Sequence, residues 1–374
     1  MNNIWRKMSL VLFFLLPGLL TLSCVAIGDN IPSASMVSEE NSSSALADEG
    51  LSSAAGKKLK PSIEPLYTVT TTNNISFGTG SIIKVIEGIT PTTKTVDMPL
   101  YLDIYEPVDA PEGLRPVVMW MYGNGFVSQL SSRKGNFVPI AHQLASRGYV
   151  VIAIDYRTAY SNPAVSEQAQ PYLTMVNNTN QYWVPKYFKP PHWPLLTEEQ
   201  YKRGIAAAYD DGLTALHWIE SESERRSLDM SRLVFMGSSS GSTTGNSLAY
   251  LSDELGIKTP EISIMIDLWG SMDYSRFDGL SEIEESEADL FIIHSIYDEA
   301  IQIANASEMA ARAKAIGLSH KFIELEPNPD GITEALKNGT GHGLALVPIL
   351  KAKAAGDDQT LFEHIIAFLN ANLP

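Results

Sequence analysis

A serine between two glycines is the feature of this sequence best suited to chemistry. Residues 237–241 (GSSSG) fit the pattern G-x-S-x-G, and they directly follow an apolar run that ends at Met236. Between a strand and a helix, this pattern places the central serine on a sharp turn with its hydroxyl exposed. Gly237 and Gly241 suit a turn too tight for larger side chains. Ser239 is therefore predicted to be a nucleophile.

A serine hydroxyl needs a base to become nucleophilic at neutral pH, and His342 is the predicted base. It lies in a glycine-rich segment, residues 339–343 (GTGHG), between the last predicted strand and the final predicted helix. The order Ser…Asp…His that accompanies an elbow of this kind puts the histidine last. The other six histidines are predicted to be structural or solvent-facing: His142, His217 and His364 in helices, His294 and His320 in or beside strands, and His192 in an insertion.

Asp298 is the predicted acid that orients the imidazole of His342. It follows the apolar run 290–293, where the third member of such a triad is expected. A buried carboxylate at this point fixes the imidazole tautomer and offsets its charge. Glu299 and Asp330 are alternatives, and a turn or helix cap is the structural explanation for Asp298.

The loop 122–126 (YGNGF) is predicted to supply the oxyanion hole, because it follows the first continuous apolar run. Backbone amides of Asn124 and Gly125 would donate from one side, and that of Ser240 from the other. A tight turn with no donor role is the alternative.

The elements that must position these residues indicate a layered α/β fold. Alternating stretches at residues 75–79 and 92–105 are typical of antiparallel strands at a sheet edge. Continuous apolar runs suit parallel strands buried on both faces, and they occupy residues 116–122, 149–156, 233–236, 262–268 and 290–293. Helices are expected at residues 137–146, 198–221, 242–251, 305–316 and 360–370, with a last strand at 320–326. The alternation predicts a mostly parallel, doubly wound sheet with helices on both faces.

One aromatic-rich insertion interrupts this alternation at residues 158–197, within a predicted catalytic domain of residues 62–374. The insertion is too long for a simple connection between elements. Its aromatic side chains favour a lid or pocket wall, since pockets are largely apolar. A packed surface excursion is the alternative.

The N-terminal segment is predicted to lie outside the fold. Residues 1–23 are typical of a secretory signal, with Arg6 and Lys7 before an apolar run. The run ends in residues 20–24 (LTLSC), which resemble a bacterial lipoprotein signal, so Cys24 is a candidate lipid attachment point. Plain secretion and an uncleaved anchor are alternatives. The serine-rich residues 24–61 predict a flexible tether, and the expected location is the cell envelope or the exterior.

Composition narrows the classes of partner. The chain has 374 residues, a net charge of −16 and one cysteine. This charge disfavours nucleic acid and anionic lipid surfaces, because both repel it. Attachment through an N-terminal lipid is compatible with the charge. A single cysteine forms no intramolecular disulfide, and the sequence leaves the oligomeric state open.

Residues 97–372 resemble the α/β-hydrolase superfamily, in its carboxylesterase and hormone-sensitive-lipase-like branch. Members of that branch usually have His-Gly-Gly-Gly where this chain has residues 122–125 (YGNG), a change that keeps the backbone donors. The marks of the resemblance are residues 102–107 (LDIYEP), 122–126 and 155–157 (DYR), Asp210 with Asp211, the elbow at Ser239, and Asp298 and His342. In this family the segment 155–157 is usually structural and joins the sheet to the loops.

The resemblance implies that Ser239, His342 and Asp298 hydrolyse small or medium acyl esters through an acyl-enzyme. It implies no metal and no organic cofactor, and the sequence has no H-E-x-x-H, P-loop or paired cysteines. The expected partner is a small-molecule or glycan ester. Alternatives are a carbohydrate acetyl or feruloyl esterase, a serine peptidase of the same fold and, from another class, a non-catalytic binding module. The presence of all three triad residues argues against the last.

Overall fold

The computed structural model describes residues 56–87, 90–127, 133–135, 137–178, 196–272, 282–298, 300–325, 342, 349–354 and 356–374. All belong to one compact unit, Gly50–Pro374. The predicted signal, Cys24 and the tether up to residue 55 lie outside the described residues, as do residues 179–195 of the insertion.

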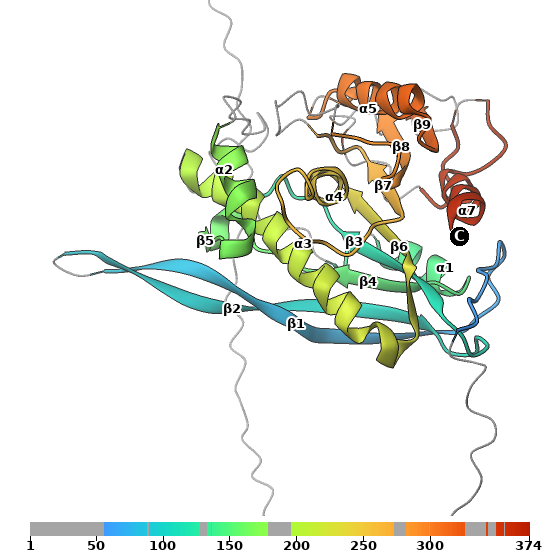
Figure 1. The fold of residues 1–374 in the computed structure, drawn as a ribbon, viewed down its shortest axis with the longest axis horizontal. Helices are drawn as coiled ribbons and strands as arrows, with labels where there is room; N and C mark the ends of the chain where they lie inside the picture. Colours follow the sequence, from blue (N-terminus) through green and yellow to red (C-terminus); the bar gives the residue numbers. More distant parts are fainter. Residues whose placement is uncertain are drawn as a thin grey trace, which may run out of the picture. The chain divides into compact units, whose positions relative to one another are not determined.

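The described residues form a nine-stranded sheet in the order β5-β1-β2-β4-β3-β6-β7-β8-β9 (Figure 1). The strands are β1 Val69–Ile86, β2 Thr92–Pro107, β3 Arg115–Met121, β4 Val150–Ile154, β5 Pro163–Ala164, β6 Leu228–Ser238, β7 Ile264–Leu268, β8 Asp289–Ser295 and β9 His320–Leu325. The helices are α1 Val138–Ala145, α2 Gln170–Asn178, α3 Glu198–Arg226, α4 Ser240–Tyr250, α5 Ile303–Ile316 and α7 Leu361–Asn372, with 3-10 turns η1 Ala159–Ser161 and η2 Glu167–Ala169.

The strands from β4 through β9 in the sheet order are parallel, which confirms the predicted mostly parallel sheet. Every residue of β4 and β7 is buried, as the continuous apolar runs require. The carboxyl ends of parallel strands meet at one edge of a sheet. The loops after β3, β6 and β8 therefore converge there, and these loops carry the predicted site residues.

The antiparallel edge is longer than the sequence predicts. β1 and β2 form a hairpin whose register runs from Val69 opposite Pro107 to Ile86 opposite Thr92. Most residues of β1 and of the first half of β2 are exposed or half-buried, so few apolar side chains mark these strands in the sequence. Among the described residues, the two-residue strand β5 alone continues the sheet beyond β1.

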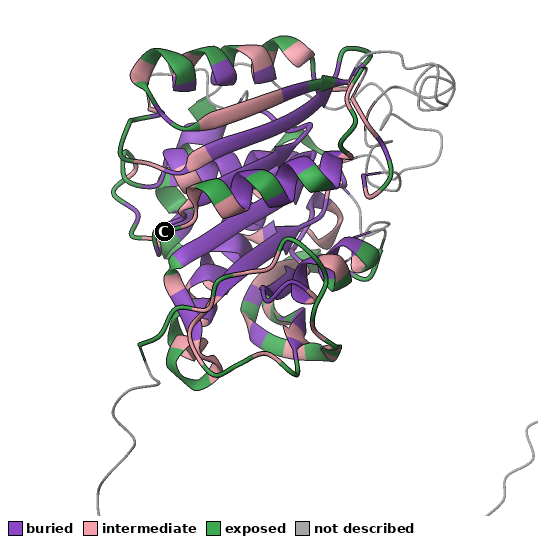
Figure 2. Ribbon diagram, turned by 90° about the vertical axis from the view of Figure 1, so that its right-hand side faces the viewer, coloured by how far each residue is buried: buried purple, intermediate pink, exposed green. Residues whose placement is uncertain are grey.

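Helices cover both faces of the sheet: α3 and α4 pack together on one face, while α1 and α7 lie on the other (Figures 1 and 2). Thr197 and Gln200 cap the start of α3 reciprocally, and the helix ends where Ser227 adopts a left-handed conformation. It extends five residues beyond its predicted end at residue 221, and the prediction stopped short because residues 222–226 are polar and give no hydrophobic periodicity. Among the described helices, none has the length and apolar character needed to cross a bilayer.

Candidate active site

The nucleophile elbow forms where β6 gives way to α4. Ser239 has φ 51° and ψ −123°, a conformation that costs energy for a residue with a side chain. The turn needs its glycines, because a Cβ at Gly237 would collide with the backbone at Ser242 and one at Gly241 with the carbonyl oxygen of Met121. The sequence pattern therefore predicts the local geometry for a steric reason.

The structure brings the three predicted triad residues together. Ser239 Oγ lies 2.7 Å from His342 Nε2, and His342 Nδ1 lies 2.7 Å from Asp298 Oδ2. The three residues come from the turn after β6, from residue 342 and from the turn after β8. The side chain of His342 is 20% exposed, whereas that of Asp298 is fully buried. The histidine is therefore partly accessible to solvent, while the carboxylate is shielded from water.

Hydrogen bonds keep Asp298 ionised despite its burial. Burial raises the pKa of Asp298, but hydrogen bonds from His294 and His342 outweigh it and bring the pKa to about 2. The other carboxylate oxygen accepts from the backbone amides of Ala300 and Ile301, each at 2.8 Å. An ionised carboxylate can only accept, so Nδ1 of His342 carries a proton. Nε2 is then the nitrogen that can accept the proton of Ser239.

The predicted oxyanion loop lies beside the elbow, but its amides already have an acceptor. The backbone N–H groups of Asn124 and Gly125 donate to Ser240 Oγ at 2.9 and 3.1 Å. Gly123 N donates to Ser238 Oγ at 3.0 Å. Sequence reasoning placed the backbone of Ser240 in the oxyanion hole and missed the part played by its side chain. Ser240 is also the first residue of α4, whose N-terminal dipole favours negative charge.

A buried tyrosine, Tyr156, forms hydrogen bonds with the oxyanion loop. Tyr156 Oη lies 2.8 Å from the carbonyl oxygen of Tyr122 and 2.8 Å from Asn124 Oδ1. Asn124 Oδ1 also accepts from Phe126 N at 2.8 Å. The segment 155–157 was expected to be structural, and Tyr156 does join the end of β4 to this loop.

Comparison with protein families gives two matches. A family model described as BD-FAE matches residues 102–179, which include the oxyanion loop. A family model described as alpha/beta hydrolase fold matches residues 202–316, which include Ser239 and Asp298. The chain has the α/β-hydrolase fold. A search of curated proteins gives no significant match.

Solved structures similar to this chain include several of esterase 2 from Thermogutta terrifontis. The form phosphoramylated by tabun has 17% identity and a TM-score of 0.49, covering 78% of this chain and 93% of that one. The propionate-bound form has 17% identity and a TM-score of 0.45, covering 75% of this chain and 97% of that one. The butyrate-bound form has 16% identity and a TM-score of 0.44, covering 66% and 83%.

A second histidine, His294, contacts Asp298, the predicted acid. His294 is fully buried, with Nε2 2.9 Å from the carbonyl oxygen of Ile301 and 3.3 Å from Asp298 Oδ2. Burial lowers the pKa of His294, but hydrogen bonds to Asp298 and Ile301 outweigh it and raise the pKa above its ordinary value. The sequence placed His294 beside a strand as a structural residue. Its four-residue spacing from Asp298, across the end of β8, is the signal that could have linked the two.

The alternative acids and the remaining histidines named in the sequence analysis are not part of the chain of hydrogen bonds described above. Glu299, Asp330 and His192 are outside the described residues. His142 packs edge-on against Tyr105, and His364 Nε2 lies 2.6 Å from Asp357 Oδ2. His217 is on α3, and His320 begins β9. Within the described ranges, no group of three or more His, Cys, Asp or Glu side chains is arranged to hold a metal ion.

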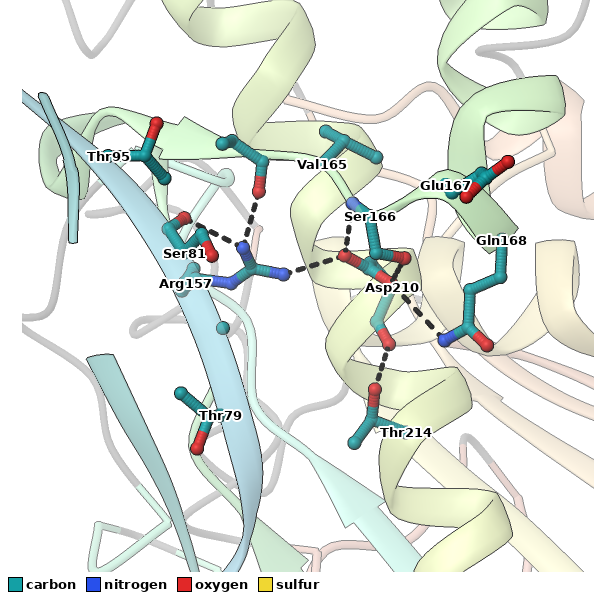
Figure 3. Close-up of a pocket in the computed structure, with 12 residues that line it drawn as sticks. Thr79, Ser81, Thr95, Arg157, Val165, Ser166, Glu167, Gln168, Asp210 and Thr214 are labelled. Atoms are coloured by element: carbon teal, nitrogen blue, oxygen red, sulfur yellow. Dashed lines mark hydrogen bonds and ion pairs between the residues drawn. The ribbon is translucent and has the colours of Figure 1, made fainter. Parts of the chain in front are cut away.

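A polar pocket of about 570 Å³ lies beside β1 and α3, and none of the triad residues is among those that line it (Figure 3). Arg157 is one of the residues that line the pocket. Its guanidinium donates hydrogen bonds to Asp210 and Asp211 and to the backbone carbonyl oxygens of Ser81 and Ala164. Arg157 and Asp211 are almost completely buried. This cluster ties β1, the start of the insertion and α3 together, which fits the structural part expected for residues 155–157.

Proposed function

We propose that this α/β hydrolase cleaves carboxylic esters through an acyl-enzyme on Ser239. The observation that carries the proposal is the hydrogen-bonded chain Asp298–His342–Ser239, with both contacts at 2.7 Å, ending at a strained elbow. A serine hydroxyl held against a neutral imidazole nitrogen is the arrangement that activates it for attack on an acyl carbon.

The reaction follows from the positions of these groups. His342 Nε2 takes the proton of Ser239 as Oγ attacks the ester carbonyl, and Asp298 stabilises the imidazolium that forms. The carbonyl oxygen becomes an oxyanion next to the start of α4 and the amides of the loop 122–126. His342 then returns the proton to the departing alcohol. Water repeats the sequence on the acyl-enzyme and releases the acid.

We favour small or medium acyl esters as substrates, with acetylated or feruloylated sugars and peptides as the competing classes. The test uses the purified protein with p-nitrophenyl esters of increasing acyl length, acetylated and feruloylated sugars, and a peptide anilide. We expect the short and medium esters to be cleaved fastest and Ser239→Ala to abolish cleavage. The proposal fails if no ester is hydrolysed, or if the alanine variant keeps full activity.

We also propose that the protein is exported and carries a lipid on Cys24. The support is the sequence alone, in the basic residues, apolar run and cysteine of residues 1–24. Cells that express the full chain should incorporate labelled palmitate into it, and Cys24→Ala should lose the label. Equal labelling of both proteins, or labelling of neither, would contradict lipid attachment at this residue.

A further inference from the structure

The two amides predicted to bind the substrate oxygen are occupied by a hydroxyl group of the protein itself. Asn124 N and Gly125 N are consecutive donors, and both point at Ser240 Oγ. Gly125 has φ 66°, the left-handed conformation that lets neighbouring amides turn toward one point. Converging amides of this kind form a concavity suited to an anion, yet here they hold a neutral oxygen.

Other contacts hold the loop without Ser240. Phe126 N donates to the Asn124 side chain, and Tyr156 Oη contacts both that side chain and the carbonyl oxygen of Tyr122. Gly123 N donates to Ser238 Oγ, on the other side of the nucleophile. The loop therefore has anchors on both sides of the two amides, and the hydroxyl of Ser240 adds to them without being their sole support.

We propose that Ser240 Oγ is an exchangeable occupant of the oxyanion amides, displaced by the substrate oxygen as that oxygen becomes negative. This inference rests on the proposed function. Amide hydrogen bonds to a charged oxygen are roughly twice as strong as those to a neutral one, so an oxyanion outcompetes a hydroxyl. On leaving, the hydroxyl keeps partners nearby, because Tyr156 Oη is 3.2 Å from Ser240 Oγ and Asn124 Oδ1 is 3.4 Å away.

The exchange has a measurable cost. The free enzyme must give up two hydrogen bonds to Ser240 before its amides bind the reacting oxygen, and this opposes the transition state. Removing the hydroxyl leaves the amides ready to bind substrate. Ser240→Ala should therefore raise kcat/KM, by about fivefold if the net free energy of exchanging the two bonds equals that of one ordinary hydrogen bond.

Ser238→Ala is the matched control. It removes a hydroxyl that also accepts from an amide of the loop and also neighbours Ser239, but that amide belongs to Gly123, which is not a predicted oxyanion donor. We expect both variants to lose a few degrees of thermal stability, because Ser240→Ala removes the acceptor of two loop amides and Ser238→Ala that of one. Only Ser240→Ala should raise kcat/KM.

Two measurements test whether Ser240 Oγ is exchanged for the substrate oxygen: the rate of ester turnover, and the rate at which a fluorophosphonate labels Ser239. A rise in both for Ser240→Ala alone supports the exchange. A fall for Ser240→Ala, or an equal change in the two variants, overturns it and makes Ser240 a support for the loop. If wild type is labelled but cleaves no ester, the proposed function fails, while the labelling rates of the two variants still test the exchange. Absence of both reactions overturns both proposals.

Discussion

Two buried ionic clusters, one around Arg157 and one around Asp298, differ in how their hydrogen bonds end. Around Arg157, every guanidinium N–H has an acceptor, supplied by Asp210, Asp211 and two backbone carbonyls. Around Asp298, the hydrogen bonds lead outward through His342 to Ser239, and His342 is partly exposed. The first cluster has no group left to react, whereas the second ends in a hydroxyl that can still form a bond.

The two carboxylates also differ in how they tolerate burial. Burial raises the pKa of Asp211 to about 6, even though Arg157 lowers it and donates to it. The pKa of Asp298 is about 2, because its hydrogen bonds outweigh its burial. The comparison shows that proximity to a full positive charge does not by itself guarantee an easily ionised carboxylate.

We expect the largest effect from Ser239→Ala, which should abolish activity and leave stability almost unchanged. Ser239→Ala removes the nucleophile, and we expect the rate of ester cleavage to fall by about a millionfold, as for other serine hydrolases of this kind. The melting temperature should change little, because the substitution removes one side-chain hydrogen bond, to His342, and leaves the backbone of the elbow as it is. Enzyme kinetics and calorimetry on the same preparation test both statements. A variant that loses activity only because it unfolds would contradict the separation.

The next effect tests the acid. Asp298→Asn leaves the shape of the side chain but presents the wrong partner to His342, so we expect kcat to fall by about ten-thousandfold. Asp357→Asn is the matched control, because Asp357 also pairs with a histidine, His364, away from Ser239. The control should keep wild-type kcat. Equal losses of kcat in the two variants would show that the effect is not specific to the hydrogen bonds that join Asp298, His342 and Ser239.

The Arg157 cluster should respond in stability. Arg157→Met leaves two buried carboxylates without their partner, and we expect a loss of about 3–5 kcal/mol in the free energy of unfolding. Adding Asp211→Asn should restore part of it, since one uncompensated charge is removed. Arg225→Met, which breaks only the exposed pair with Glu222, should cost far less. Chemical denaturation measures all three variants, and similar losses at residues 157 and 225 would contradict the assignment.

The smallest effect is the pH dependence of stability, where the two carboxylates act with opposite sign. The pKa of Asp298 is lowered on folding, so its contribution is present above about pH 4 and is lost as pH falls toward 2. The pKa of Asp211 is raised on folding, so its penalty grows as pH rises from about 4 to 6. Each amounts to about 2–3 kcal/mol.

Unfolding curves from pH 2 to 7 check this comparison. Asp298→Asn should flatten the acid limb between pH 2 and 4, and Asp211→Asn should flatten the decline between pH 4 and 6. If Asp298→Asn instead changes the curve between pH 4 and 6, or Asp211→Asn changes it between pH 2 and 4, the two pKa directions are assigned to the wrong groups.

Much of the fold followed from local patterns. The apolar runs predicted the parallel strands because a strand buried on both faces needs nothing but apolar side chains. The hairpin β1–β2 was underestimated, since its exposed threonines and lysines carry little periodic signal. The helix boundaries of α3 and α4 moved by up to five residues, because capping and the elbow set them more than hydrophobic spacing does.

The sequence by itself indicated the candidate nucleophile and the chain order of its predicted partners, because a tight glycine turn and an ordered set of loops are local, linear features. Only the tertiary structure decided which groups meet across the site. It placed His294 against Asp298, Tyr156 beneath the oxyanion loop, and Ser240 Oγ on the amides of Asn124 and Gly125. The contacts of Tyr156 and Ser240 with the loop join residues far apart in the chain, so no spacing rule encodes them. His294 and Asp298 are only four residues apart, and there the fold decided the direction of the two side chains.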